Sequence, residues 1–192
     1  MLVEPPKSVT PMTNLSLVQQ LTTVLSSLLT EERGITEPTV IEGAFVLALT
    51  WSLGGALTQP GRVQFDKFLK KLAGLPTSGG ESCQCGQLPS SLPTLHDYTF
   101  DLDQRQWRPW TAEVPDYVPP ADGKFASIVV PTSDTVRSTW VLNQVASVRG
   151  AVLFVGESGT AKTTVISKYR QIPPLISYIL YLISCILYLV FS

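Results

Sequence analysis

One short stretch of the sequence, GESGTAKT, has residue types and spacing that suit phosphate binding. The phosphate-loop pattern is G-x-x-x-x-G-K-[ST], and Gly156, Lys162 and Thr163 occupy three of its fixed positions. Ala161 stands where the pattern has its second glycine. Glycine reaches a positive φ without strain, whereas alanine there costs about 1 kcal/mol, which is small beside a site with many phosphate contacts. The sequence therefore predicts a phosphate site despite this substitution.

Elementary chemistry assigns a role to each part of the loop. Backbone N–H groups at the start of a helix would surround the phosphates. Lys162 would reach the β- and γ-phosphates, and the Thr163 hydroxyl would coordinate Mg2+. The predicted nucleotide-binding residues are Gly156, Glu157, Ser158, Gly159, Thr160, Ala161, Lys162 and Thr163. The competing interpretation is a strand, a turn and a helix with a coincidental lysine.

The loop requires a buried strand before it and a helix after it. AVLFV, residues 151–155, is a continuous apolar run of strand length, as found in parallel sheets covered on both faces. AKTTVISKY can continue as the helix. Upstream, Thr132 or Ser133 can cap another helix, with Asp134 in its first turn. That helix is expected to bury Val136, Trp140, Val141, Val145 and Val148.

Three further helices are predicted between Asn14 and Gly74, where apolar residues recur at three- and four-residue steps. The second of them begins at Pro38, with Thr39 and Glu42 offering a capping box, and stops at a pair of glycines. We expect the three to pack together as a small helical unit, with the lysines of the third on a solvated face. The third helix is expected to bury Phe65, Phe68, Leu69 and Leu72.

The remaining polar and sulfur-containing residues indicate little further chemistry. YTFDLDQRQWRPW alternates apolar and polar residues around a polar turn, which predicts a β-hairpin. His96 just before it is expected to be structural. The spacing of Cys83, Cys85 and Cys185 fits neither a disulfide framework nor a zinc site, so we expect reduced thiols in a cytoplasmic setting. With 14 Lys and Arg against 15 Asp and Glu, the chain has no electrostatic footprint for nucleic acid.

Several quoted stretches resemble one protein family. LFVGESGTAKT closely resembles the phosphate loop of the third AAA+ module in axonemal dynein heavy chains, where the second glycine is also commonly replaced. YTFDLDQRQWRPWTAEVPDYVPP and IVVPTSDTVRSTWVLNQ resemble the entry into that module, and FVLALTWSLGGALTQPGRVQFDKFLKKL is similar to the helical lid of the second. The resemblance covers about Thr13 to Thr163.

The resemblance implies a fragment or short isoform of a microtubule motor of cilia, located in the cytoplasm, the cytoskeleton and the axoneme. It implies ATP or ADP with Mg2+ as cofactors, and a regulatory nucleotide site in the third module. Residues 128–131 would lie near the adenine. The implied partners are the remainder of a dynein ring and, through it, microtubules and other dynein chains.

The predicted fold class is an α/β AAA+ P-loop fragment. It would comprise a helical lid, a connecting β-hairpin, the start of a truncated parallel sheet and an apolar C-terminal helix. The predicted regions are a helical lid-like region at 13–74, a Gly/Pro/Ser-rich loop at 75–94, a hairpin and extended connector at 95–124, a truncated P-loop core at 125–170 and an apolar tail at 171–192.

The sequence departs from the family after the phosphate loop. No Asp or Glu follows Glu157, so the acidic Walker B residue that the family implies is missing, and hydrolysis by this chain alone is not expected. The tail repeats ISYILYL as ISCILYL and carries no charge from Leu175 onward. As a helix it would measure about 27 Å, against about 30 Å for the apolar core of a membrane.

Three interpretations stay open at this point. The favoured one is a dynein fragment whose apolar tail is foreign to the fold. The second is a tail-anchored, non-catalytic interaction protein, which uses dynein-like helices and is membrane-associated through Leu175–Phe191. The third is an unrelated small P-loop NTPase, which the missing acidic residues disfavour.

Overall fold

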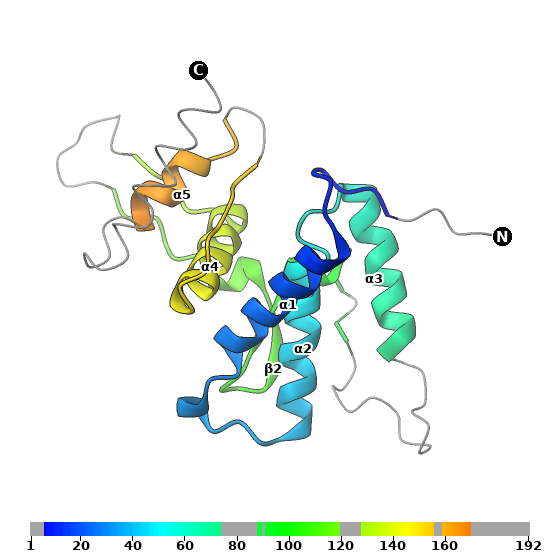
Figure 1. The fold of residues 1–192 in the computed structure, drawn as a ribbon. Coiled ribbons are helices and arrows are strands. Elements are labelled where there is room, and N and C mark those ends of the chain that lie inside the picture. Colours follow the sequence, from blue (N-terminus) through cyan, green and yellow to red (C-terminus); the bar gives the residue numbers. More distant parts are fainter. Residues whose placement is uncertain (1–5, 74–87, 90, 120–127, 156–158, 170–192) are drawn as a thin grey trace, which may run out of the picture. The chain divides into compact units, whose positions relative to one another are not determined.

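The computed structural model describes residues 6–73, 88–89, 91–119, 128–155 and 159–169 (Figure 1). The chain divides into two compact units, Met1–Glu113 and Val114–Ser192. In the described ranges, the first unit contains three α-helices and a two-stranded sheet, and the second contains two α-helices.

The first unit begins with a helix that has a side-chain cap. α1 (Asn14–Leu28) starts after Thr13, whose hydroxyl accepts a backbone N–H of the first turn at 3.2 Å. Such a cap satisfies one of the N–H groups that every helix start leaves without an intrahelical partner. α1 packs on α2 and buries Val24 and Leu28. One 3-10 turn, η1 (Glu31–Arg33), connects the two helices.

The second helix, α2 (Pro38–Ser52), is apolar around most of its circumference. Its start differs from the predicted capping box of Thr39 and Glu42. Glu37 is the N-cap, and the Thr39 hydroxyl donates to the Glu37 carboxylate at 2.9 Å. Proline lacks an N–H and suits the first helical position, so the helix begins before the expected cap. Its buried apolar side chains are Val40, Ala44, Val46, Leu47 and Ala48.

The third helix, α3 (Gln59–Ala73), attaches to the unit through a narrow face. Phe65 and Leu69, four residues apart, are buried on that face. The prediction that Phe68 and Leu72 are buried as well is wrong, because they are 60% and 49% exposed. Within the described chain, the elements around α3 cover only the strip through Phe65 and Leu69. The buried cluster around that strip includes Val46, Leu57 and Leu95.

The predicted hairpin is present. β1 (Tyr98–Asp101) and β2 (Gln106–Pro109) pair antiparallel, with Tyr98 opposite Pro109 and Asp101 opposite Gln106. In the turn, the Asp101 carboxylate accepts the backbone N–H groups of Asp103 and Gln104 at 3.0 and 2.8 Å. A carboxylate that accepts nearby backbone N–H groups stabilises a turn, and the position of Asp101 here is of that kind.

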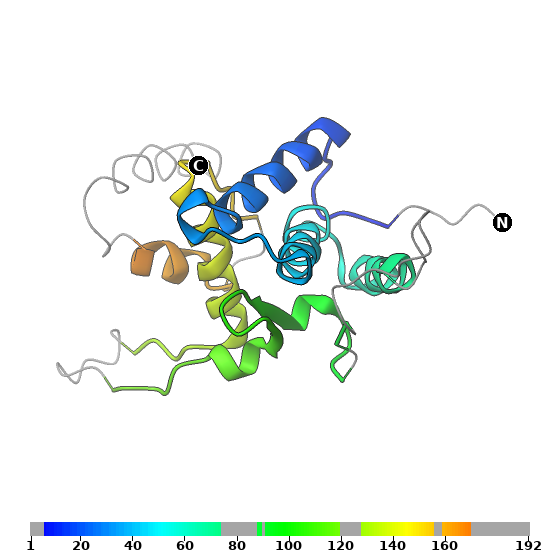
Figure 2. The ribbon, with the colours of Figure 1, turned by 90° about the horizontal axis from the view of Figure 1, so that it is seen from below.

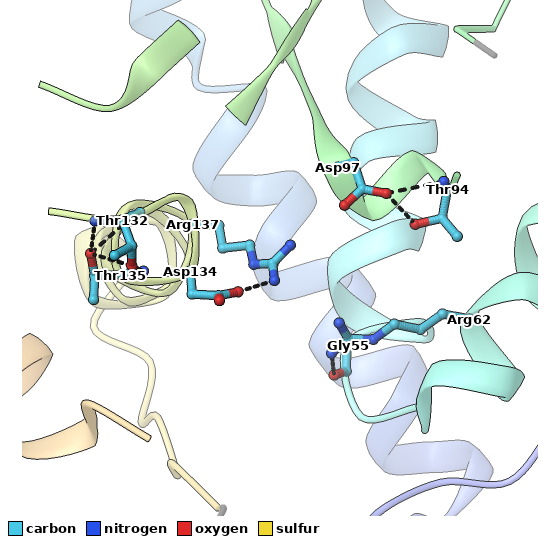
Figure 3. A network of polar contacts seen from close by, with 8 residues as sticks. All are labelled: Gly55, Arg62, Thr94, Asp97, Thr132, Asp134, Thr135 and Arg137. Carbon is cyan, nitrogen blue, oxygen red and sulfur yellow. Dashed lines mark hydrogen bonds and ion pairs between the residues drawn. The ribbon is translucent and has the colours of Figure 1, made fainter. Parts of the chain in front are cut away.

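The hairpin approaches α2 closely at one glycine. A Cβ atom at Gly43 would lie 2.5 Å from the ring of Phe100 on β1, so only a residue without a side chain allows this packing. A single-turn helix, η2 (Leu95–Asp97), leads into β1. Thr94 precedes it and donates both its N–H and its hydroxyl to the Asp97 carboxylate (Figure 3).

His96 is structural, as predicted. Its side chain is 1% exposed, and its Nε2 lies 3.0 Å from the Gly54 carbonyl oxygen, to which it donates because a carbonyl can only accept. Trp51 packs edge-on against the imidazole, with ring centroids 5.7 Å apart. Trp51 also packs edge-on against Trp110, which opens η3 (Trp110–Glu113). The histidine therefore ties the start of the hairpin to the end of α2.

The second unit pairs α4 (Ser133–Ser147) with α5 (Lys162–Tyr169). Leu142 and Val165 are buried between them, and Phe154 packs partly buried against this pair. The stripe expected to be buried on α4 is only half-buried, because α5 covers the strip through Leu142 instead. That expected stripe consists of Val136, Trp140, Val141, Val145 and Val148.

Both ends of α4 are capped locally. At the start, the Thr132 hydroxyl accepts the N–H of Thr135, and the Thr135 hydroxyl accepts the N–H of Thr132 (Figure 3). This confirms Thr132 as the cap. At the end, Arg149 takes a left-handed φ of +58°, and the N–H groups of Arg149 and Gly150 reach carbonyls of the last turn. That pattern is the usual left-handed closure of a helix, here with arginine in the place where glycine is common.

The predicted start of a parallel sheet is not formed in the described residues. Their one sheet is the antiparallel hairpin, and neither residues 128–131 nor residues 151–155 form a strand. Leu153 and Val155 are exposed. A parallel strand takes its backbone hydrogen bonds from neighbouring strands, and none lies beside 151–155 within the described part.

The predicted apolar helix at 171–192 falls outside the described residues, so the structure does not test it. Among the residues that are described, no helix combines the length and the apolar composition needed to cross a membrane.

Candidate phosphate-binding loop

The loop of interest is attached to the second unit through the helix that follows it. α5 begins at Lys162, and its first-turn hydrogen bond runs from the Val165 N–H to the Ala161 carbonyl at 3.0 Å. Val165 is buried beside Leu142 of α4. One turn of α5 therefore separates the loop from the buried contact that positions it.

The backbone before α5 alternates in the sign of φ. Gly159 has a φ of +83° and Ala161 a φ of +59°, whereas Thr160 between them and Lys162 after them do not have a positive φ. Alternating left- and right-handed residues turn successive N–H groups toward a common side, which creates a small concavity for an anion. The N-terminus of α5 adds a positive partial charge at the same place.

Ala161 takes the conformation for which the phosphate-loop pattern uses glycine. The sequence alone left open whether this position needs a positive φ, and the structure places Ala161 in the left-handed region. For a residue with a Cβ, that region costs about 1–2 kcal/mol. The loop therefore keeps the glycine conformation without having the glycine.

The two side chains expected to contact the nucleotide lie in the first turn of α5. The Lys162 ammonium donates to the Thr160 hydroxyl at 2.8 Å, so the lysine is held beside the concavity. Thr163, which follows it directly, is exposed. An ammonium, a hydroxyl and a backbone concavity within five consecutive residues fit the phosphates and the metal ion of a nucleotide.

The structure describes only part of the predicted site. It brings together Gly159, Thr160, Ala161, Lys162 and Thr163, whereas Gly156, Glu157 and Ser158 lie outside the described residues. The hydrogen bond from Lys162 to Thr160 could not be predicted, because a hydroxyl two residues before a lysine has no particular signature. In the described chain, no group of three His, Cys, Asp or Glu residues is arranged to hold a metal ion.

Comparison with known protein families places this geometry in context. Residues 2–112 match the family described as the dynein heavy chain AAA lid domain. Residues 117–186 match the P-loop containing dynein motor region. The chain belongs to the dynein heavy chain family. The dynein lid match ends close to the boundary between the two compact units. The dynein motor-region match runs to residue 186, well into the apolar tail that the sequence suggested was foreign to the fold.

Known dynein heavy chains resemble most of this chain. The dynein-1-alpha heavy chain of the flagellar inner arm I1 complex of Chlamydomonas reinhardtii is 42% identical over 88% of the chain. Human dynein axonemal heavy chain 10 is 42% identical over 86% of it, and rat dynein axonemal heavy chain 5 is 34% identical over 73%. The chain spans 4% of the length of each of these three dyneins.

Proposed function

We propose that this chain is a nucleotide-binding segment of an axonemal dynein heavy chain. It would consist of the lid of the second AAA+ module followed by the phosphate loop of the third. The observation that carries the proposal is the loop from Gly159 to Thr163, with its alternating φ and its lysine at the start of α5. The membership of the chain in the dynein heavy chain family supports reading this loop as a nucleotide site.

In this proposal each loop residue has a separate task. The N–H groups between Gly156 and Ala161 surround the phosphates. Lys162 gives up its hydrogen bond to Thr160 and neutralises phosphate charge. The Thr163 hydroxyl would hold Mg2+, and this ion would offset negative charge on the phosphates of a bound nucleotide.

We further propose that the chain binds nucleotide without hydrolysing it alone. Phosphoryl transfer needs an acidic group that positions the metal ion and the attacking water, and the sequence has no Asp or Glu after Glu157. Residues outside this chain would supply that group. The remainder of a dynein heavy chain would also supply neighbouring strands for residues 151–155, which could then join a sheet.

The cellular setting follows from the relatives and is likewise a proposal. They are named axonemal or flagellar dyneins, and these names support the proposal that the chain acts in the cytoskeleton of the cilium. Its partners would be the remainder of a dynein ring and other dynein chains, and through them microtubules.

Titration of the full chain with a fluorescent ATP analogue in the presence of Mg2+ tests the nucleotide proposal. We expect weak but saturable binding, because one loop offers few contacts to offset the cost of association. Lys162→Ala should weaken it about tenfold, a difference of about 1.4 kcal/mol. Lys7→Ala, a change at an exposed lysine of the first unit, is the matched control and should have no effect. Equal affinities for Lys162→Ala and the unchanged chain would overturn the proposal.

A further inference from the structure

Along one flank of its buried strip, α3 carries apolar side chains that the described chain leaves uncovered. Phe68 and Leu72 lie one helical turn apart and are both largely exposed. α3 lies beside α2 at the edge of the first unit (Figures 1 and 2), and its helical periodicity puts these two side chains along one flank of the buried strip. An exposed phenylalanine and leucine in adjacent turns form an apolar ledge of the kind that anchors a partner.

A row of positive charge runs alongside this ledge. Lys67 and Lys71 each precede one of the two apolar residues, so the two rows run parallel along the helix. Both lysines are exposed, and neither forms an ion pair within the described residues. Lys70 differs, since its ammonium lies 2.8 Å from the carboxylate of Asp66. The free charge of α3 is therefore concentrated next to the ledge.

Charge complementarity indicates what can cover this face. An occupant must bring apolar side chains for the ledge and carboxylates for the lysines, both at a spacing of one helical turn. The apolar tail has no carboxylate, because no Asp or Glu follows Glu157. The loop after α3 contributes a single one, Glu81. Neither of these segments supplies the two carboxylates that the lysine row requires.

We propose that α3 is a docking face for an acidic amphipathic helix of another polypeptide. The apolar side of that helix packs on Phe68 and Leu72, and its carboxylates pair with Lys67 and Lys71. The apolar pair supplies most of the affinity, whereas the lysines fix the orientation and select an acidic partner over a basic one. The proposal is independent of the phosphate loop, since it uses only residues of the first unit.

Binding of designed helical peptides to the full chain tests this docking face. The probe is a labelled peptide with leucine at every fourth position and glutamate beside each leucine. A second peptide carries lysine in place of each glutamate. Fluorescence anisotropy should show saturable binding of the acidic peptide and about tenfold weaker binding of the basic one, with a preference that fades as salt is added.

Matched variants separate the docking face from non-specific adhesion. Lys67→Glu/Lys71→Glu should invert the preference, so that the basic peptide binds better. Phe68→Ser should weaken acidic-peptide binding about tenfold. Leu15→Ser, at a leucine of α1 that is 69% exposed, should leave it unchanged. Because these side chains are exposed, circular dichroism should stay the same for all variants. Absence of saturable binding, failure of the charge swap to invert the preference, or an equal loss in Leu15→Ser would each overturn the proposal.

Discussion

The two units differ in how they bury apolar surface. In the first, buried side chains of α2, α3 and η2 meet in one cluster, α1 packs on α2, and Leu47 and Leu95 are each 1% exposed. In the second, the buried apolar side chains of the described ranges are Leu142 and Val165. The unit with the recognisable nucleotide motif is therefore the one with the smaller described core. A motif that predicts chemistry does not by itself predict stability.

The difference has a physical origin in the type of secondary structure. A helix forms its backbone hydrogen bonds internally, and a hairpin forms them between two adjacent strands. The elements of the first unit therefore need no strand that is distant in the sequence. A parallel strand depends on partners that are distant in sequence. Residues 151–155 have the composition of such a strand but no strand beside them in the described chain. In the described part of the second unit, two helices therefore pack around one small contact.

Core truncations should show the largest contrast between the units. Leu47→Ala should lower the free energy of unfolding of the first unit by about 3 kcal/mol, because it leaves a cavity in a closely packed core. Leu142→Ala should cost less in the second unit, where half-buried neighbours can move into the space. Urea denaturation followed by tryptophan fluorescence would measure the loss of stability in Leu47→Ala. Amide exchange in α5 would measure the loss in Leu142→Ala. Equal losses would break the comparison.

A buried carboxylate should have the next largest effect, again in the first unit. Asp66 accepts the Leu95 N–H at 2.8 Å and the Lys70 ammonium at 2.8 Å, which joins α3 to η2. Asp66→Ala leaves that buried N–H without its acceptor, so we expect a loss of about 2 kcal/mol in urea denaturation. Asp103→Ala, at an exposed position in the hairpin turn, is the control. A loss no larger than that of the control would mean that the contacts of Asp66 do not help to hold α3 in place.

Acid should weaken the hairpin. The pKa of Asp101 lies below its ordinary value, mainly because the carboxylate accepts the backbone N–H of Gln104. The backbone N–H of Asp103 and the guanidinium of Arg108 lower the pKa further, whereas burial acts in the opposite direction. A lowered folded-state pKa adds stability above the unfolded-state pKa, and this is lost as pH falls through the folded-state value. Asp101→Asn should therefore remove part of the acid sensitivity below about pH 4, measured by denaturation at several pH values. An unchanged pH profile would exclude Asp101 as its source.

The smallest expected effect is a gain in local stability in the second unit. Ala161→Gly keeps the left-handed φ and removes the Cβ that strains it, so we expect about 0.5–1 kcal/mol of added local stability. Slower amide exchange at the start of α5 would report it. Ala151→Gly, at an exposed residue without regular structure, should give no gain. Faster exchange in Ala161→Gly would mean that the flexibility of glycine outweighs the relief of strain.

Local signals in the sequence predicted the local structure well. The helix starting at Pro38, the hairpin and the Thr132 cap all depend on neighbouring residues, and each is present. The φ of Ala161 is a local feature of the same kind, because this residue takes the left-handed conformation for which the pattern uses glycine. Nucleotide binding by the loop stays a prediction. The sequence also predicts a structural role for His96, since no residue near it in sequence could use it chemically, and the side chain is buried and hydrogen-bonded.

Features that depend on distant contacts were predicted less well. Helical periodicity places Phe68 and Leu72 near the buried strip of α3, but only the neighbouring elements decide how wide that strip is. The composition of residues 151–155 predicts a strand, but a strand forms only where another strand lies beside it. The described chain has no such strand next to these residues. The hydrogen bond from Lys162 to Thr160 depends on the turn that Gly159 and Ala161 create together.

The buried histidine at the end of α2 also gives the dynein lid a spectroscopic label of its own. The chain contains a single histidine, so its imidazole protons produce one set of NMR signals that needs no assignment by mutation. The edge-on ring of Trp51 lies 5.7 Å away and displaces those signals from the positions of a solvated imidazole. Their return to solvated positions would therefore mark the moment at which hairpin and helix separate, including in a longer dynein segment whose other histidines are replaced.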